Sequence, residues 1–366
     1  MACTFSERPA PCSFAAGPAM LPRGVLAQIR EELPDWHGSG FSLLEQSFTS
    51  TAFKQLMADT EQDLRALLAI PHNYRVLFMQ GGASAQFGLL PLNLLEPRQS
   101  ADYLESGLWA RKAIGEARRH APVNVVASGA AGGFTALPPV EKWRCNPHAG
   151  YCHITSNETG NGLQMPDFPE LPVPPVADTT SDFLTRPIPV ERFGLIYASA
   201  QKNLGVAGLC LVIVREDLLR PPRRGLPSAF SYQVQAIQQS RFNTPPTFAL
   251  YVAGLMLRWI IRQGGLTVMA ARAREKSRRL YECLDSHDFY RCPQVAADRS
   301  TINVCFQLED PGLLDDFFHQ AARNGLHDLQ GHSAVGGVRA SLYNAVEITA
   351  VERLVRFMND FAHHHG

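Results

Sequence analysis

The chain has 366 residues, a formal net charge of zero and 45% hydrophobic residues, which is enough for a large core and predicts two domains. Zero net charge argues against nucleic acid and anionic membranes as partners, and no apolar run approaches the roughly 20 residues of a membrane span. We therefore expect small-molecule partners. The start of the chain shows no signal-peptide pattern, and the eight cysteines include no CxxC pair. These features predict a cytoplasmic protein without a disulfide framework or a zinc site.

Residues 1–22 are rich in proline and small residues and are predicted to form an N-terminal arm. Two helices should follow, one ending before Pro34 and a longer amphipathic one over residues 50–68. Next come a buried strand over residues 74–79 and a turn at Gly81-Gly82 that opens a helix. Strand, glycines and helix together predict a phosphate cradle, because free amides and the positive end of a helix favour an anion. Close packing explains a Gly-Gly turn equally well, so this pattern is weak by itself.

Three further strand ends carry polar or aromatic side chains. A strand over residues 100–108 is followed by Trp109, which the pattern places before a helix over residues 110–120. An indole at that place can stack on a cofactor ring, although core packing is an equally good explanation. Another strand ends at residues 157–159. A third apolar run ends at Asp178, at the kind of strand end where open α/β sheets bind ligands.

The segment around Lys202 organises these features. An apolar strand runs into this lysine, a small-residue turn rich in glycine surrounds it, and a second apolar strand leads away. A lysine between two core strands is desolvated and can be neutral, which makes it a candidate Schiff-base lysine. Taken alone, an ordinary loop lysine is the better interpretation. Together with Asp178 it supplies what pyridoxal phosphate (PLP) needs, because the lysine holds the aldehyde and the acid keeps the ring nitrogen protonated.

Alternating strands and helices over residues 60–260 predict a mainly parallel sheet that helices cover on both faces. A rigid turn over residues 243–248 starts a long helix, and glycines at 264 and 265 end it. Beyond it, a basic helix, two strands and two further helices predict a smaller α+β domain. The predicted fold is α/β, with an N-terminal arm (1–22), a large domain (23–261) and a small C-terminal domain (262–366).

Seven motifs, in order along nearly the whole chain, resemble those of the phosphoserine aminotransferases, a family of fold type I PLP aminotransferases. A series of seven motifs is very specific. The resemblance implies a PLP-dependent aminotransferase that exchanges an amino group between an α-amino acid and a 2-oxo acid, as a homodimer with shared active sites. The motifs cover residues 14–22, 76–87, 157–159, 176–178, 197–208, 243–248 and 331–345.

The resemblance also implies roles for individual residues. Lys202 would hold the cofactor aldehyde and move the proton between the substrate Cα and the cofactor. Asp178 would pair with the ring nitrogen, and Trp109 would stack on the ring. Arg339 would grip the substrate α-carboxylate with two hydrogen bonds. The remaining cofactor contacts would be Ala83, Ser84 and Gln201 at the phosphate, Thr159 near O3′, and Asn243 and Thr244, which would reach the phosphate from the other subunit.

The chain departs from this family in the pocket for the substrate side chain. Where the family has two His-Arg pairs, this chain has Phe48-Thr49 and His332-Ser333. Those family residues bind the phosphate of phosphoserine and the distal carboxylate of glutamate, and each charge-assisted contact is worth about 1.5–3 kcal/mol. We therefore predict a specificity shifted away from phosphoserine, toward a substrate without a phosphate, in a specialised biosynthetic pathway. The alternative is that phosphoserine is still used because another basic residue fills the gap, such as Arg220, Arg223, Arg224 or Arg241.

Other functions are consistent with the sequence. The same lysine and acid could serve a lyase, decarboxylase or racemase, since the cofactor stabilises the carbanion and the protein chooses the bond that breaks. A non-catalytic scaffold on a retired enzyme fold would have no reason to keep five chemically matched groups together: Lys202, Asp178, Trp109, Thr159 and Arg339. A metal hydrolase is disfavoured, and no metal site is expected, because the histidines show no ligand spacing beside an acid.

Overall fold

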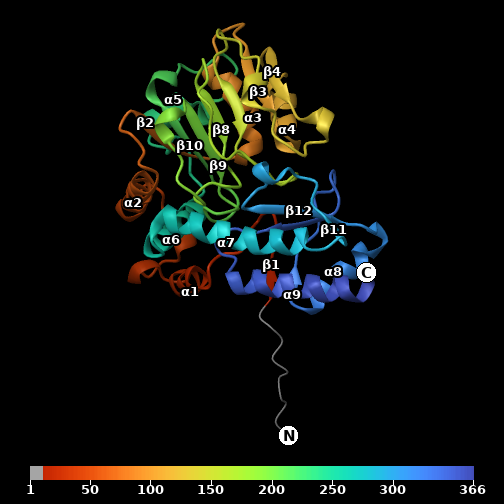
Figure 1. Ribbon diagram of the computed structural model, residues 1–366. Helices are drawn as coiled ribbons and strands as arrows, with labels where there is room; N and C mark the ends of the chain where they lie inside the picture. The colour runs from red at the N-terminus through yellow and green to blue at the C-terminus, as the bar shows by residue number, and fades with distance from the viewer. Residues whose placement is uncertain (1–10) are drawn as a thin grey trace.

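A seven-stranded sheet forms the centre of the larger part of the protein (Figure 1). The computed structural model describes residues 11–366. All strands of this sheet run in one direction except β10, which is antiparallel to both of its neighbours. The arrangement confirms the predicted mainly parallel sheet. In spatial order the strands are β2 (Tyr74–Met79), β10 (Cys210–Arg215), β9 (Leu195–Ser199), β8 (Pro175–Asp178), β5 (Cys152–Thr155), β3 (Ala101–Glu105) and β4 (Val123–Ser128).

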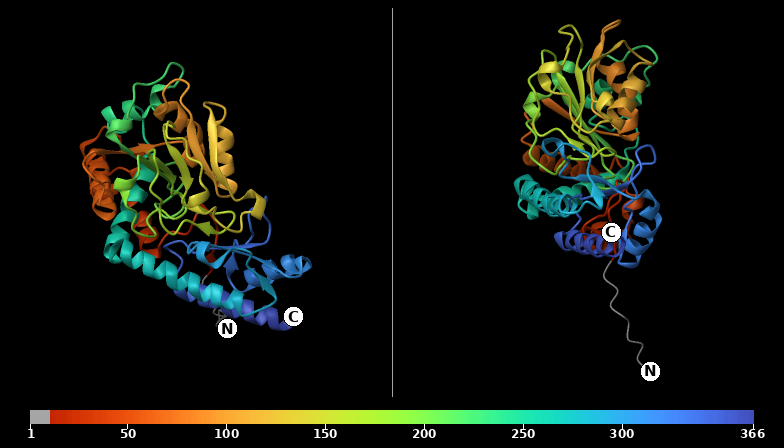
Figure 2. Two further views of the ribbon diagram at one scale, coloured as in Figure 1. Left: turned by 45° about the horizontal axis from the view of Figure 1, so that its top comes forward. Right: turned by 45° about the vertical axis from the view of Figure 1, so that its right-hand side comes forward.

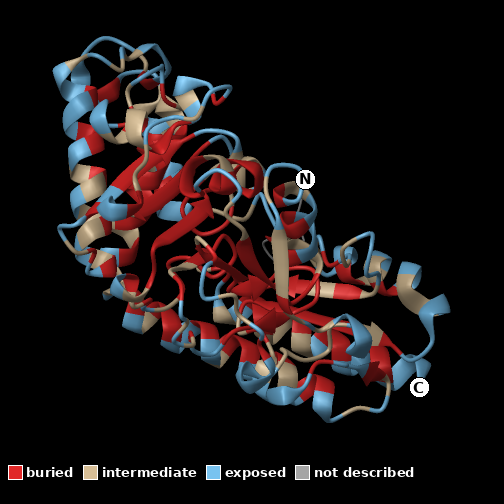
Figure 3. Ribbon diagram, turned by 90° about the horizontal axis from the view of Figure 1, so that it is seen from above, coloured by how far each residue is buried: buried red, intermediate tan, exposed pale blue. Residues whose placement is uncertain are grey.

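Helices cover both faces of this sheet because its strands are apolar on both sides. In β2, Val76 and Phe78 join the hydrophobic core on one face, whereas Leu77 and Met79 join the core on the other, as the two-residue period of a strand requires. The strands are buried and the outer helix surfaces are exposed (Figure 3). One face carries α1 (Arg23–Glu32), α2 (Thr51–Leu68) and α6 (Thr247–Arg262), and the other carries α3 (Gly82–Leu94), α4 (Leu108–Ala117) and α5 (Tyr232–Ile237).

A smaller antiparallel sheet forms the core of the C-terminal part, in which β12 pairs with both β11 and β14. Phe306 of the sheet packs edge-on against Phe317, which in turn packs against Phe361 of the last helix. Strands and helices of this kind confirm the predicted smaller α+β unit. Its elements are β11 (Tyr290–Arg291), β12 (Asn303–Leu308), α8 (Leu314–Arg323), β14 (Val338–Ser341) and α9 (Ile348–His365).

The long helix α7 (Gly265–Asp285) joins the two cores. Leu266 and Met269, in its first turns, pack into the core of the large sheet. Leu280 and Leu284, near its end, pack into the C-terminal core. Figure 2 shows this helix running from the larger part of the molecule along the smaller one. The predicted domain boundary near residue 262 lies just before it and stays a prediction. Within residues 11–366 we find no helix with both the length and the apolar character that a bilayer crossing requires.

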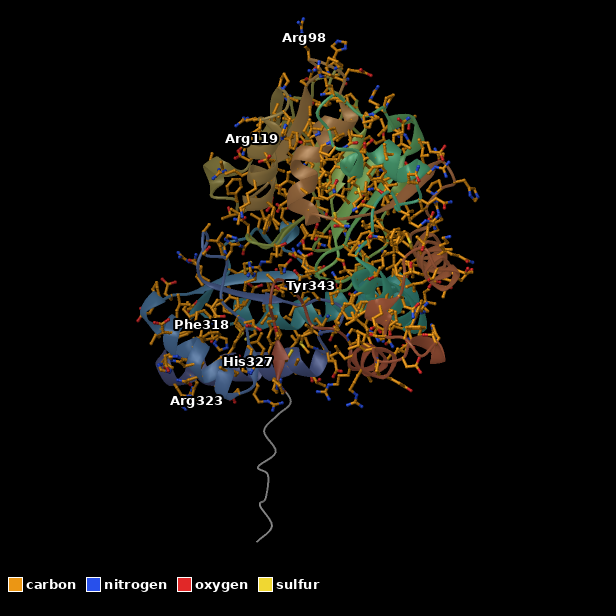
Figure 4. The ribbon with its side chains drawn as sticks, turned by 180° about the vertical axis from the view of Figure 1, so that it is seen from behind. Arg98, Arg119, Phe318, Arg323, His327 and Tyr343 are labelled. Atoms are coloured by element: carbon orange, nitrogen blue, oxygen red, sulfur yellow. The ribbon has the colours of Figure 1, made fainter. Side chains whose placement is uncertain are left out.

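The predicted N-terminal arm packs onto the C-terminal part over the portion that the structure describes; its residues 1–10 lie outside the described range. β1 (Cys12–Ser13) pairs in parallel with β13 (Leu326–His327), and Phe14 is fully buried in the C-terminal core. The hydroxyl of Tyr343 donates a hydrogen bond to the carbonyl of Ala16 at 2.8 Å. Figure 4 shows Tyr343 in the middle of the molecule, whereas Arg98, Arg119 and Arg323 lie at its edge.

The buried amine of Lys276 on α7 fastens the loop that follows β14. Its Nζ donates hydrogen bonds to the carbonyls of Leu342 and Tyr343 at 2.8 Å and of Val346 at 3.0 Å. The residue is only 3% exposed, so water cannot replace these bonds. The carbonyls of Leu342 and Val346 therefore depend on this one side chain, whereas that of Tyr343 also accepts the backbone N–H of Val346 at 2.9 Å.

We expect Lys276→Met to lower the free energy of unfolding by roughly 2–5 kcal/mol, because two buried carbonyls lose their donor and a third loses one of its two donors. Equilibrium unfolding in urea measures the change. The control is Arg278→Met on the same helix, which breaks only exposed ion pairs with Glu275 and Glu282 and should change stability much less. Equal effects of the two substitutions would contradict the anchoring role.

Candidate active site

The predicted site residues gather at one edge of the large sheet. Since all strands except β10 run in one direction, the segments that follow β2, β3, β5, β8 and β9 meet at the carboxyl edge. Asp178 is the last residue of β8, and Lys202 lies three residues after the end of β9. The fold therefore brings together side chains from distant parts of the sequence.

The amine of Lys202 is buried and polarised. The residue is 7% exposed, and its Nζ donates a hydrogen bond to Oγ1 of Thr159 at 2.6 Å. Burial lowers the pKa of this amine from 10.5 to about 8; the negative charge of Asp178 opposes this change and the positive charge of Arg339 adds to it. Near neutral pH this lowered pKa leaves far more of the amine neutral than in an ordinary lysine, and the neutral form is the one that attacks an aldehyde.

The N-terminal segment covers the lysine turn, a contact that the sequence did not predict. The amide of Ala19 donates to the carbonyl of Gln201 at 2.8 Å. A Cβ on Gly17 would lie 3.4 Å from Cγ of Lys202, and the φ of Gly17 is +132°, which side chains disfavour. The only sequence signal was the Gly17-Pro18 turn. Glycine lets the backbone approach the lysine side chain closely.

Asp178 is a buried carboxylate whose negative charge has no cation bonded to it within residues 11–366. Its Oδ1 accepts the backbone N–H of Thr180 at 2.9 Å. Burial raises the pKa of this carboxyl, against the opposing effects of Thr180 and of the Lys202 charge. A protonated ring nitrogen would supply the missing positive partner.

Trp109 lies within the first turn of α4 and not before the helix, which corrects the prediction of a helix over residues 110–120. The helix starts earlier because Gly107 and Leu108 already belong to its capping turn. The ring centroid of Trp109 is 6.0 Å from Nζ of Lys202. Its indole Nε1 is buried and has no hydrogen-bond partner in the described part of the chain. The ring thus offers an aromatic face beside the reactive amine.

Glu158 holds the start of α4, a role that the sequence did not assign. Its carboxylate accepts the backbone N–H groups of Trp109 at 2.8 Å and Ala110 at 2.9 Å, and the hydroxyl of Ser106 at 3.1 Å. A Cβ on Gly107 would lie 2.6 Å from its Cδ. Burial raises the pKa of Glu158 to about 7 against the effect of these hydrogen bonds. This carboxylate fixes the backbone that carries the Trp109 ring.

The predicted phosphate cradle coincides with the start of α3. Gly81 and Gly82 have positive φ angles of +93° and +64°, and no side chain caps the helix N-terminus. The first amides, including those of Ala83 and Ser84, therefore have no acceptor within the helix. A Cβ on Gly82 would lie 3.3 Å from Oγ of Ser199, and Ser199 donates to the side-chain oxygen of Gln201. Gln201 and the helix start thus lie side by side.

Arg339 and His332 occupy the C-terminal side of the site. Arg339 is the second residue of β14, makes no ion pair with any described acidic residue, and has a buried Nε without a partner. The ring of His332 meets that of Trp109 edge-on, with centroids 6.1 Å apart. A guanidinium without an acid partner beside the reactive amine can receive a carboxylate.

Five predicted site residues have no direct link to Lys202 within one chain. No hydrogen bond, ion pair or ring contact in the described range joins them to the lysine, Asp178 or Arg339. Phe48 packs against the core of the large sheet, and the Thr49 hydroxyl bonds to that of Ser47 at 2.8 Å. The other three are exposed: Ser333, Asn243 and Thr244.

The residues at this edge fit PLP. A buried neutral amine can hold the aldehyde, and Asp178 lacks a cation that a protonated ring nitrogen would provide. Trp109 offers a face for the ring, and the uncapped start of α3 suits the phosphate. Each of these four groups can therefore bind a different part of the cofactor: the aldehyde, the ring nitrogen, the ring face or the phosphate.

Comparison with known proteins points to the same chemistry. A family model for class-V aminotransferases matches residues 13–354. The chain is 48% identical over 363 residues to the phosphoserine aminotransferase of Nitrosomonas europaea, covering 97% of this chain and 99% of that protein. It resembles the solved phosphoserine aminotransferase of Bacillus circulans subsp. alkalophilus with a TM-score of 0.94 and 40% identity, over 96% and 98% of the two chains. It also resembles the PLP-bound phosphoserine aminotransferase of Trichomonas vaginalis, with a TM-score of 0.91 and 36% identity, over 94% of this chain and 99% of that one.

We expect the apoprotein to take up PLP with a rate that rises with pH and levels off above about pH 8, because the neutral Lys202 amine reacts. In Arg339→Met this profile should move to higher pH, since a positive charge that disfavours the protonated amine is gone. Stopped-flow absorbance measures the profile.

The control for this shift is Arg323→Met on α8, at the edge of the molecule (Figure 4). Its profile should match that of the unmodified protein. A pH profile that stays unchanged or moves to lower pH in Arg339→Met would contradict the coupling between the charges of Arg339 and Lys202.

Proposed function

The chain belongs to the class-V aminotransferase family, and from that premise we propose that it exchanges the amino group between phosphoserine and 2-oxoglutarate. The protein is a PLP-dependent transaminase, so lyase chemistry and a non-catalytic scaffold are set aside. The observation that carries the choice of substrate is the similarity to phosphoserine aminotransferases, which extends over 97% of this chain. This observation favours the alternative of the sequence analysis over the predicted shift in specificity.

Lys202 and Asp178 carry the chemistry in this proposal. Bound PLP supplies an electron sink that stabilises a carbanion at the substrate Cα. Nζ of Lys202, with its pKa lowered to about 8, would take the proton from the substrate Cα and deliver it to the cofactor carbon that carried the aldehyde oxygen, and would move it back when the reaction runs in reverse. Thr159 orients this amine through the 2.6 Å hydrogen bond. Asp178 stays ionised as long as a positive partner faces it.

Arg339 and Trp109 place the reactants. The unpaired guanidinium of Arg339 binds the α-carboxylate through two parallel hydrogen bonds, which fixes the orientation of Cα. The backbone N–H of Trp109 is held by the carboxylate of Glu158 at 2.8 Å, and the Trp109 ring would cover one face of the cofactor and exclude water there. Arg339 also keeps the Lys202 amine partly neutral. One cation thus serves substrate binding and lysine reactivity.

A substrate with an uncharged side chain is the second candidate. Phe48, Thr49 and Ser333 carry no charge that could bind a distal phosphate or carboxylate. Phe48 also presents an apolar ring that is only partly buried against the large core. These observations keep the predicted shift in specificity as a competing hypothesis that a substrate panel can decide.

A homodimer completes the proposed site. Asn243 and Thr244 are exposed, and no contact within residues 11–366 joins their side chains to Lys202, Asp178 or Arg339, although the backbone carbonyl of Thr244 accepts a hydrogen bond from the Gln80 side chain at 2.8 Å. The segment directly before them exposes large apolar side chains, with Ile237 70% and Phe242 47% exposed. Burying this segment against a second copy would remove apolar surface from water and would bring the two polar residues to the neighbouring active site.

A cytoplasmic location stays part of the proposal. All seven cysteines within residues 11–366 are free. Proteins of reducing compartments keep their thiols in this state. The free thiols agree with the absence of a disulfide framework that the cysteine spacing predicts.

We expect kcat/KM for phosphoserine with 2-oxoglutarate to exceed that for alanine by roughly 10² or more, because each charge-assisted contact to a distal anion contributes about 1.5–3 kcal/mol. Coupled assays of glutamate formation over a panel of charged and neutral amino donors measure this ratio. Lys202→Ala serves as the inactive control. A preference for a neutral donor would support the second candidate and reject phosphoserine as the substrate.

We expect Phe242→Asp to weaken the dimer and the retention of PLP together, because a charge enters the interface beside the residues that reach the neighbouring site. Light scattering gives the mass, and absorbance after gel filtration gives the PLP content. The matched control is Val295→Asp, an apolar residue that is 51% exposed elsewhere on the surface. A monomeric parent protein with full activity would overturn the shared-site proposal.

A further inference from the structure

Lys112 places an unpaired ammonium group beside the Trp109 ring. It lies on α4 three residues after Trp109, and its Nζ is 4.4 Å from the centroid of the Trp109 ring. The residue is exposed, and no hydrogen bond or ion pair of its side chain occurs within residues 11–366. Glu116, one turn further along the helix, faces Arg119 and His120 instead. No acidic neighbour therefore neutralises Lys112.

The Trp109 ring is the common neighbour of Lys112, Lys202 and His332. Nζ of Lys202 lies 6.0 Å from its centroid, and the His332 ring lies 6.1 Å from it. The two amines cannot be farther apart than the sum of their distances to this ring. That span is on the order of a small substrate plus one hydrogen bond. A substrate that reacts at Lys202 can therefore present a distal group to Lys112.

Two neutral N–H groups without a described acceptor, one on His332 and one on Trp109 itself, also lie at this place. The amide of Ala334 donates to Nδ1 of His332 at 3.1 Å, so the proton of the neutral imidazole is on Nε2 and free to donate. Burial, Lys112 and Arg339 all lower the pKa of His332, which keeps the ring neutral. Nε1 of Trp109 is buried without a partner. An ammonium and two neutral N–H donors without an acceptor are suited to an anion.

We propose that Lys112 binds the distal anionic group of the substrate, with His332 as a neutral donor beside it. This inference rests on the proposed function, because it names the cation that recognises a phosphorylated or dicarboxylate substrate. Lys112 would replace the charge that the family has, and this chain lacks, at positions 48, 49 and 333. It is a different residue from the four arginines that the sequence suggested for this role. The phosphate of phosphoserine and the distal carboxylate of 2-oxoglutarate or glutamate share the required chemistry.

The proposal can be tested with Lys112→Met, which keeps the length of the side chain and removes its charge. We expect kcat/KM for phosphoserine and for glutamate to fall roughly tenfold to a hundredfold, mainly through KM, while kcat/KM for alanine stays nearly unchanged. Lys112→Arg should restore most of the loss. Inhibition by inorganic phosphate gives a second measurement, and its inhibition constant should rise in Lys112→Met.

The matched control is Arg111→Met, the neighbouring exposed cation on the same helix, which is paired with Glu105 at 2.8 Å. It should leave all four measurements unchanged. An equal loss for alanine and phosphoserine would show that Lys112 acts through Trp109 and would overturn the proposal. Unchanged constants for every anion would overturn it as well.

The parent protein separates this inference from the proposed function. If it does not use phosphoserine, the proposed function fails. The role of Lys112 is then decided by glutamate and inorganic phosphate. A selective loss with those two anions would support it, and no loss would reject it.

Discussion

The site depends on keeping one lysine amine out of water. Desolvation of a lysine is costly, and the fold supports it by surrounding Lys202 with two core strands, the Thr159 hydroxyl and the backbone near Gly17. The consequence is an amine with a pKa of about 8, which is neutral often enough to react. The parallel strands bring these groups together, because their carboxyl ends place the lysine turn, Asp178 and the start of α3 at one edge of the sheet.

The charges around this amine are divided between structure and chemistry. Glu158 is satisfied by the backbone of α4 and by Ser106, so its work is to position Trp109. Asp178 and Arg339, in contrast, form no ion pair among residues 11–366, although both lie in the site. Unpaired charges in such a place are costly to the fold and are typical of functional sites. The cofactor ring nitrogen and the substrate carboxylate are the partners that they lack.

The N-terminal segment, the first half of α4 and strand β14 contribute to the same site. The N-terminal segment packs on the lysine turn through Ala19, and β14 brings Arg339 from the C-terminal part. Helix α4 carries Trp109 and, one turn later, Lys112, so that cofactor stacking and the proposed anion recognition come from one helix face. Substitutions on α4 and near His332 can then change which substrate side chain is accepted, while Lys202 and Asp178 stay the same.

The sequence by itself determined the mainly parallel sheet, the strand ends that carry Asp178 and Lys202, and the glycine turn before α3. Strand periodicity and glycine turns are local, so they can be recognised without the fold. It also indicated Trp109 and Arg339 through their resemblance to family motifs, although it placed Trp109 outside the helix. Only the tertiary structure decided that Glu158 binds the start of α4, that Gly17 approaches Lys202, and that Lys112 and His332 both lie beside the Trp109 ring. These contacts join residues far apart in the chain, and burial and pKa depend on all the segments that meet at a point, which no local pattern records.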